Sequence, residues 1–315
     1  MESTQELQAA AAEIARPPKK KRFFSGLDKK QAVYGYLFLA PTCILFFIFS
    51  LIPTVLGIMY SFTDMAPGYP WEFGWTIGNY KYLFSDMVYL HSILNVFVYT
   101  LMSVPMSVVF SLLVAVLLNR KTRGIKFFRV IYYLPAVTSG VATAFVWRWM
   151  YNETYGLFNT ILTDWFGMEE GLQWVNTQNY FAMFCIALVT TWTGIGGNML
   201  IYLAGLQSIS PELYEAAELD GANGWQRLIR ITVPLLSPTT YFITTMALIG
   251  SFQLFDVVAM IGGDGNYYAQ TPVTQIEAAF RHGTGGMASA MSVILFAVIM
   301  IVTFITQKLI KEKQV

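Results

Sequence analysis

Apolar residues gather into six long runs separated by shorter polar stretches. Each run has roughly 20 residues, enough for a helix to cross about 30 Å of hydrocarbon. The pattern predicts an all-α, polytopic membrane protein with six transmembrane helices, over approximately residues 36–60, 95–118, 130–150, 180–206, 235–260 and 288–307. The first run is too long for a cleaved signal peptide and follows about 35 mostly polar residues, so we expect it to remain as a membrane anchor.

Composition excludes a water-soluble domain of this size. Hydrophobic residues make up 55% of the chain and charged residues 12%, where soluble domains carry about 25% charge. Both cysteines, Cys43 and Cys185, fall inside apolar runs, so no disulfide framework is expected. His91 and His282 are single and far apart, which gives no metal-ligand spacing. No arrangement of nucleophile and base is apparent, so we predict neither catalytic residues nor an enzyme.

The distribution of basic residues predicts which loops are cytoplasmic. Successive polar segments between the runs lie on alternate sides of the membrane. Of the 20 lysines and arginines, only Lys81, Arg148 and Arg281 fall on one of these two sides. By the positive-inside rule both termini face the cytoplasm. Residues 1–30 form a basic leader that we expect to be mobile. Its Lys-rich stretch suits anionic lipid beside a first span better than nucleic acid, which is the alternative.

The cytoplasmic loop 207–233 differs in kind from the others. Ser210 can cap a helix that begins with Pro211. Gly221 follows that helix where a left-handed exit is needed. A second short helix then leads to Pro234, so the loop is predicted to be a helix, a turn and a helix at the membrane surface. The adjacent alanines Ala216 and Ala217 would let another protein approach the backbone closely. An amphipathic connector resting on lipid headgroups is the alternative interpretation.

This loop resembles the EAA loop of bacterial ABC-importer permeases. The matching string is Glu215-Ala216-Ala217-Glu218-Leu219-Asp220-Gly221-Ala222, with Ile231-Thr232-Val233-Pro234 downstream. From about Val33 onwards the chain is similar to the maltose- and glycerol-phosphate-type sugar permeases. Phe252-Gln253-Leu254-Phe255-Asp256 resembles the first permease of the pair. One stretch departs from the family, because Gly262-Gly263-Asp264-Gly265-Asn266-Tyr267 stands where a Gly-Gly-Pro followed by threonine is usual.

The resemblance implies a type I ABC importer permease fold over residues 31–315 and a set of partners. These are a second, non-identical permease, an ABC ATPase dimer and an extracytoplasmic solute-binding protein, in a bacterial cytoplasmic membrane. Glu215, Ala216, Ala217, Asp220 and Gly221 would couple the chain to the ATPase. No Gly-x-x-x-x-Gly-Lys-Ser/Thr sequence occurs, so we expect this chain to bind no cofactor and a partner ATPase to use the ATP and magnesium.

Four polar or aromatic residues in the apolar runs are candidates for the substrate path: Gln253, Asp256, Asn198 and Trp192. A carboxylate within a membrane is costly and suggests a functional site. Gln253 and Asp256 are expected one turn apart on one helix face. Helix packing, or an aspartate that meets water at a helix end, is the alternative for each. Arg148 at a boundary is the one cationic residue near the spans, which favours a neutral sugar over glycerol 3-phosphate.

Two other classes of protein stay open at this point. A secondary carrier or channel would need inverted repeats and broken helices, and no convincing halves of that kind are visible in the sequence. A structural scaffold would leave the EAA-like loop without a function. The particular sugar or polyol carried cannot be read from these residues.

Overall fold

The computed structural model describes residues 29–66, 74–120, 122–261 and 265–311. Nearly all of the expected leader, residues 1–30, lies outside this part, as do Gly262, Gly263 and Asp264 of the departing stretch. The regular elements within the described residues are all helices, which confirms the all-α prediction. The chain divides into two compact units, Met1–Leu56 and Gly57–Val315.

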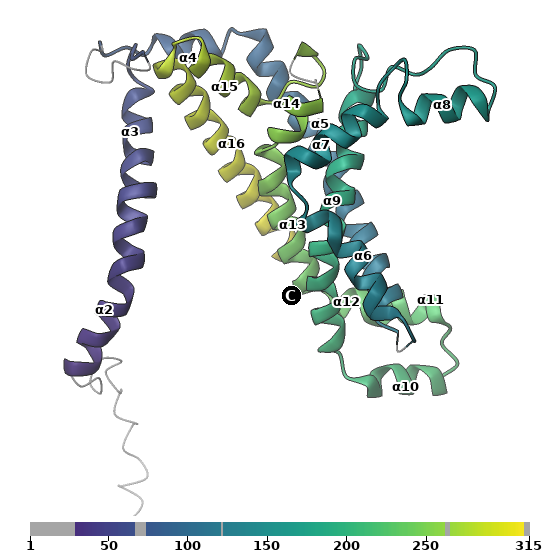
Figure 1. Ribbon diagram of the computed structural model, residues 1–315. Coiled ribbons are helices and arrows are strands. Elements are labelled where there is room, and N and C mark those ends of the chain that lie inside the picture. Colours follow the sequence, from purple (N-terminus) through teal and green to yellow (C-terminus); the bar gives the residue numbers. More distant parts are fainter. Residues whose placement is uncertain (1–28, 67–73, 121, 262–264, 312–315) are drawn as a thin grey trace, which may run out of the picture. The chain divides into compact units, whose positions relative to one another are not determined.

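The first unit holds most of a single apolar helix, which has a wide turn in its middle and ends at Tyr60 in the second unit. α2 (Lys29–Phe46) continues into the π-helix η1 (Phe47–Leu51) and then into α3 (Ile52–Tyr60) (Figure 1). Pro53 has no N–H for the carbonyl of Phe49, and its ring would crowd that carbonyl, which is a physical reason for the wide turn. No residue of its most apolar window is buried within the protein.

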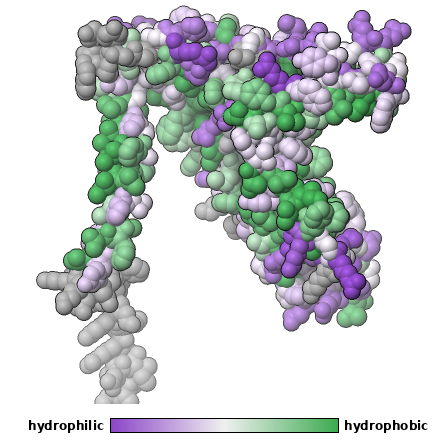
Figure 2. Space-filling model, viewed as in Figure 1, coloured by the Kyte–Doolittle hydropathy of each residue, from purple (hydrophilic) through white to green (hydrophobic). Residues whose placement is uncertain are grey.

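Three helices of the second unit are long and apolar enough to cross a membrane unbroken. They are α5 (Met87–Leu118), α9 (Phe181–Gln207) and α16 (Gly285–Lys311). Together with the helix of the first unit they make four continuous spans, and two bent helix pairs raise the number to six in the described residues. Green apolar surface covers the middle of the second unit, and polar side chains gather at its two ends (Figure 2).

The third predicted run is a bent pair. α6 (Ile125–Val137) and α7 (Gly140–Met150) meet at 94°. Thr138 leaves the helical region with ψ of 146° and ends α6, and α7 starts two residues later. Thr138, Ser139 and Gly140 interrupt the apolar run at this point, but the two halves are similarly apolar, so hydropathy alone indicates one continuous span.

The fifth predicted run is broken as well. α13 (Ser237–Phe252) ends before Gln253, and α14 (Asp256–Ile261) begins only at Asp256. The carbonyl of Leu254, freed by the break, accepts a hydrogen bond from the fully buried Thr271 hydroxyl at 2.8 Å. The expectation that Gln253 and Asp256 lie one turn apart on one helix face is therefore wrong. A hydrogen bond from a distant residue replaces the helical ladder there, and a local pattern cannot reveal it.

α5, α9 and α13 form the centre of the second unit, and α6 packs against α9. One apolar cluster at this centre joins Tyr202 and Leu206 of α9 to Leu236 and Ile243. Gly196 brings α9 and α6 into backbone contact, since a Cβ there would lie 2.4 Å from the carbonyl oxygen of Tyr132. Small residues at such contacts allow close packing where no hydrophobic effect drives helices together.

Short helices and asparagine amides order the end of the second unit that is opposite α10 (Pro211–Leu219) (Figure 1). The helices are α4 (Gly78–Leu83), α8 (Leu157–Asp164), α14 and α15 (Pro272–Arg281). The buried Asn159 accepts from the backbone N–H of Leu172 and the Trp174 indole, both at 2.9 Å. Buried polar groups are paired in this way because an unpaired one costs about 1–3 kcal/mol.

Substituting Gly196 tests the backbone contact between α6 and α9. Gly196→Ala should lower the melting temperature of the purified chain in detergent, because the new Cβ must push the Tyr132 carbonyl away at a cost of about 1–3 kcal/mol. Gly197→Ala is the matched control, since nothing lies within 4 Å of a Cβ there. Equal melting temperatures for the two variants would contradict the observed packing.

Candidate functional site

The helix α10 is the first part of the candidate site. It begins at Pro211 after the extended residue Ser210, and Glu212 lies in its first turn. The Ser210 side chain makes no capping hydrogen bond. Pro211 and the carboxylate of Glu212 therefore favour the start of the helix here without a side-chain cap. The helix ends as predicted, with Gly221 in the left-handed region at φ +79°. The N–H of Ala222 then donates to the carbonyl of Ala217 at 2.9 Å, the bond of a Schellman-type helix end.

One side of α10 rests on the protein and the other meets solvent. Tyr214 and Ala217 are half-buried, while Glu215 and Ala216 are exposed. Leu219 is 91% exposed, which is unusual for a leucine with no partner surface. The two alanines thus lie on different sides of the helix, with Ala216 available to another molecule. The acidic residues Glu212, Glu215 and Asp220 are also exposed, so the free side of α10 carries negative charge.

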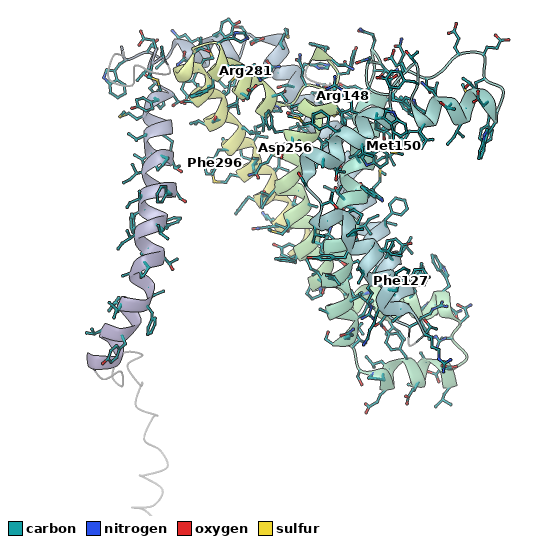
Figure 3. The ribbon with its side chains drawn as sticks, viewed as in Figure 1. Phe127, Arg148, Met150, Asp256, Arg281 and Phe296 are labelled. Carbon is teal, nitrogen blue, oxygen red and sulfur yellow. The ribbon has the colours of Figure 1, made fainter. Side chains whose placement is uncertain are left out.

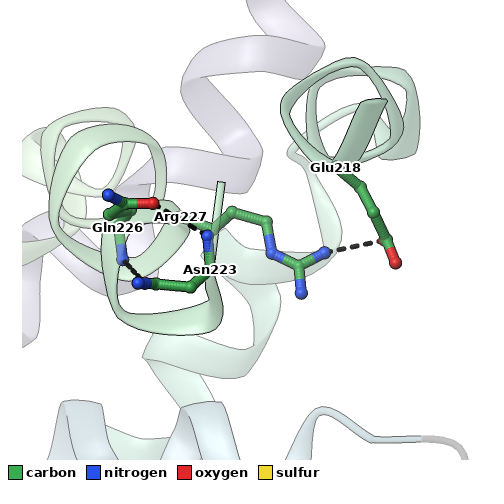
Figure 4. Close-up of polar contacts among 4 residues, drawn as sticks. All are labelled: Glu218, Asn223, Gln226 and Arg227. Carbon is green, nitrogen blue, oxygen red and sulfur yellow. Dashed lines mark hydrogen bonds and ion pairs between the residues drawn. The ribbon is translucent and has the colours of Figure 1, made fainter. Parts of the chain in front are cut away.

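A second helical segment follows the turn. Asn223 and Gln226 form a reciprocal capping box, with the two backbone N–H groups bonded at 2.8 and 2.9 Å (Figure 4). The segment comprises α11 (Gly224–Arg227), the π-helix η2 (Leu228–Thr232) and α12 (Val233–Leu235). It starts directly after its cap Asn223 and meets α13 at a bend of 69°.

Two polar contacts join α10 to this segment. Arg227 forms an ion pair with Glu218 at 2.8 Å (Figure 4). The Tyr214 hydroxyl lies 3.0 Å from the Thr232 hydroxyl. The ion pair is largely exposed and contributes about 0–1 kcal/mol. The half-buried hydroxyl pair is worth about 1 kcal/mol net. Neither contact was predicted, because they join residues 9 and 18 positions apart.

A half-open cavity of about 270 Å³, with hydroxyls set in a mostly apolar lining, lies between α5, α9 and α13. Its hydroxyl-bearing lining residues are Tyr99, Ser103, Ser107, Thr190, Thr191 and Ser251. Asn198 also lines it, and its amide donates to the Ser107 hydroxyl at 2.9 Å. The Thr191 hydroxyl is buried without a hydrogen-bond partner. No charged side chain is among the lining residues, so the cavity offers hydrogen bonds without net charge.

Of the four substrate-path candidates, only Asn198 reaches this cavity. Trp192 is 45% exposed and packs edge-to-face on Trp147, with ring centroids 5.7 Å apart. Gln253 and Asp256 are exposed on either side of the helix break, and Asp256 lies toward the end opposite α10 (Figure 3). The structure does not bring the four residues together into one site.

The cavity hydroxyls had a signal in the sequence. Tyr99, Ser103 and Ser107 are spaced by four residues along α5, which places them on one helix face. Thr190 and Asn198 are eight residues apart on α9 and share a face in the same way. Each of these residues taken alone is ordinary in a membrane helix. Only the regular spacing of four or eight residues indicates a polar helix face.

A second polar pocket, of about 340 Å³, lies at the end of the unit opposite α10. Arg148, Glu153 and Asn176 contribute to its lining, and Asn176 donates to the Glu153 carboxylate at 2.8 Å. Arg148 is exposed at the end of α7 (Figure 3). Burial raises the pKa of the neighbouring Tyr151 hydroxyl, so it stays protonated and donates to the Cys185 carbonyl. Among the described residues no group of three or more His, Cys, Asp or Glu could hold a metal ion.

Comparison with known proteins places these features in one family. The family model described as "Binding-protein-dependent transport system inner membrane component" matches residues 73–314. The chain is 33% identical over 288 residues to the probable ABC transporter permease protein YesP of Bacillus subtilis, covering 89% of this chain and 91% of the relative. It is 31% identical over 295 residues to the arabinooligosaccharides transport system permease protein AraP of Halalkalibacterium halodurans, covering 92% and 90%.

A solved structure has the same fold. It is that of a bacterial alginate ABC transporter in complex with an alginate pentasaccharide-bound periplasmic protein, with a TM-score of 0.79 and 23% identity over 90% of this chain and 96% of that one. This similarity confirms the expected permease fold. The resemblance seen at the EAA-like loop is confirmed by the family match, and the chain is a transport subunit rather than an enzyme. The chain belongs to the family of inner membrane components of binding-protein-dependent transport systems.

Proposed function

We propose that this chain is a membrane-spanning permease subunit of an ATP-driven carbohydrate importer. The observation that carries the proposal is α10, a solvent-exposed helix with a free acidic and small-residue side, at one end of a helical unit whose spans line a half-open cavity that contains hydroxyl groups. A membrane subunit without an ATPase of its own needs a surface through which energy arrives. The exposed Glu215, Ala216 and Leu219 would form that surface.

The positions of charged residues support an orientation with α10 in the cytoplasm. Arg129 donates to the carbonyl of Leu118 at 2.8 Å, and the labelled Phe127 on the same helix lies at the α10 end of the unit (Figure 3). Arg148 lies at the opposite end (Figure 3). The basic segment between α5 and α6 therefore lies at the same end of the second unit as α10, as the positive-inside rule requires of a cytoplasmic surface.

The proposed complex has several further members. They are a second, non-identical permease, two ATPase subunits that use ATP and magnesium, and an extracytoplasmic solute-binding protein. The family is that of binding-protein-dependent systems, and the similar alginate structure contains a periplasmic protein. Nucleotide would favour one conformation of the ATPase pair and thereby one position of α10. Transport then follows from a two-state equilibrium that ATP and the loaded binding protein both influence.

A neutral sugar suits the cavity best. Hydroxyls and an amide contribute to its lining, and these pair well with sugar hydroxyls. The AraP relative is named for arabinooligosaccharides. The similar structure is named for alginate, an acidic polysaccharide, so it supports a carbohydrate but not a neutral one. Glycerol 3-phosphate is the second substrate class, but a phosphate would call for cationic lining residues, which this cavity does not provide. An acidic sugar would need charge from the second permease.

A secondary carrier is the competing function, because two of the predicted spans are broken and broken helices occur in such carriers. Copurification separates the two. In mild detergent, the chain should be isolated together with an ABC ATPase, and transport should require ATP. Isolation of a stable, transport-active chain without any ATPase would favour the carrier.

Gly221 tests whether the geometry of α10 matters for coupling. Gly221→Val should reduce sugar uptake while the chain still inserts into the membrane, because a side chain in the left-handed conformation costs about 1–2 kcal/mol and would displace the end of α10. Gly224→Ala is the control, since Gly224 has no positive φ and nothing lies within 4 Å of its Cβ. Wild-type uptake by both variants would remove the support for α10 as the coupling element.

Asn198 tests the cavity as the substrate path. Asn198→Leu should lower kcat/KM for sugar uptake about tenfold, which corresponds to about 1.4 kcal/mol, because substrate would lose an amide and the Ser107 hydroxyl its partner. Thr193→Val is the control on the same helix. The Thr193 hydroxyl bonds to its own helix backbone and does not line the cavity. An unchanged kcat/KM in Asn198→Leu, or an equal loss in both variants, would exclude this role.

A further inference from the structure

The contacts around Arg227 form a closed ring between the two helical segments of the loop. Tyr214 and Glu218 are four residues apart on α10, so their side chains lie on one face. Glu218 binds the Arg227 guanidinium at 2.8 Å. The carbonyl oxygen of Arg227 accepts from the Thr232 hydroxyl at 3.3 Å, and that hydroxyl lies 3.0 Å from the Tyr214 hydroxyl.

The direction of these hydrogen bonds follows from the number of protons. A threonine hydroxyl has one proton. Because the Arg227 carbonyl can only accept, Thr232 gives its proton to that carbonyl. The Tyr214 hydroxyl must then be the donor to Thr232. Each polar group in this part of the ring thus has a defined partner. Removal of either hydroxyl interrupts this series of hydrogen bonds.

The ring holds α10 at two points one helical turn apart. A single contact would let α10 roll or pivot on the second segment, whereas two contacts on one face oppose both motions. Thr232 is only 4% exposed, so its end of the ring lies at the protein interior. The next buried residue, Leu236, packs near Gly205 of α9, where a Cβ would meet its side chain at 2.9 Å.

The connection to the spans passes through a wide helical turn. Thr232 is the last residue of η2, and α12 and α13 follow it. π-helical turns are rare and are often found at functional sites. We propose that Tyr214 and Thr232 are positioning residues that transmit the displacement of α10 to the base of α13, so that α10 and residues 224–235 move as one lever. This inference rests on the proposed coupling function.

Hydrogen–deuterium exchange in the complete importer tests the proposal without knowledge of the sugar. The importer, in lipid nanodiscs, is compared without nucleotide and after trapping with MgATP and vanadate. In the wild type, amide exchange should change with nucleotide both in α10 and in residues 228–235. In Tyr214→Phe and in Thr232→Val, the change in α10 should persist, while the change in residues 228–235 should shrink about fivefold, the factor that one net hydrogen bond represents.

Two variants serve as matched controls. Thr232→Ser keeps the hydroxyl and should restore the response of residues 228–235. Tyr202→Phe removes a tyrosine hydroxyl that bonds to Thr240 at 3.2 Å between α9 and α13, outside the loop. It should behave as the wild type, which separates transmission through the ring from a general loss of one Tyr–Thr hydrogen bond.

The remaining outcomes contradict one claim or the other. If residues 228–235 respond normally in Tyr214→Phe, the lever is excluded and the coupling function stands. If α10 itself loses its response in that variant, the ring serves docking and not transmission, which also overturns the inference. If α10 of the wild type shows no response to nucleotide, the proposed coupling function fails, independently of the ring.

Discussion

Backbone hydrogen bonding in hydrocarbon is the constraint on which this structure depends. A peptide group in a bilayer has no water to pair with, so every N–H and C=O of a span must find a partner within the protein. Long helices such as α5 and α9 meet this requirement locally. Where α13 ends and α14 begins, the freed Leu254 carbonyl is instead satisfied by the buried Thr271 hydroxyl. The irregular backbone at this break is tolerated because such a partner is in place.

The same constraint separates the two candidate parts of the site. Within the spans, several polar side chains pair with one another around a cavity, as Asn198 does with Ser107 and Tyr99 with Thr190. At the end of the unit, α10 leaves the apolar region and exposes Glu215, Ala216 and Leu219. The cavity can hold a polar solute, and α10 can be displaced by a partner protein. The two are thus connected through α13. The proposed importer function requires both, and the contacts of Tyr214 and Thr232 describe how they are joined.

Local signals in the sequence predicted the loop well. Proline at the start of α10 and glycine at its end act through backbone geometry alone, so the helix and its left-handed exit at Gly221 follow from neighbouring residues. The all-α class likewise follows from the length of the apolar runs. The break at Gln253 was missed, because an apolar run does not show where a distant hydroxyl replaces a helical bond. The pairing of Gln253 with Asp256 failed for that reason. Of the cavity residues, Asn198 was a predicted candidate, whereas the hydroxyl-bearing residues were missed because their spacing, and not their identity, carries the signal.

Chemical crosslinking from α10 tests the central claim most directly. A cysteine introduced as Ala216→Cys, in a chain with Cys43→Ser, should crosslink to an ATP-hydrolysing subunit in native membranes, and MgATP should change the yield. A cysteine at Thr154, which lines the pocket of about 340 Å³ at the end opposite α10, should give no such product and should react with impermeant thiol reagents from outside the cell. Crosslinking of Thr154→Cys to the ATPase, with none from Ala216→Cys, would contradict both the orientation and the route by which energy enters.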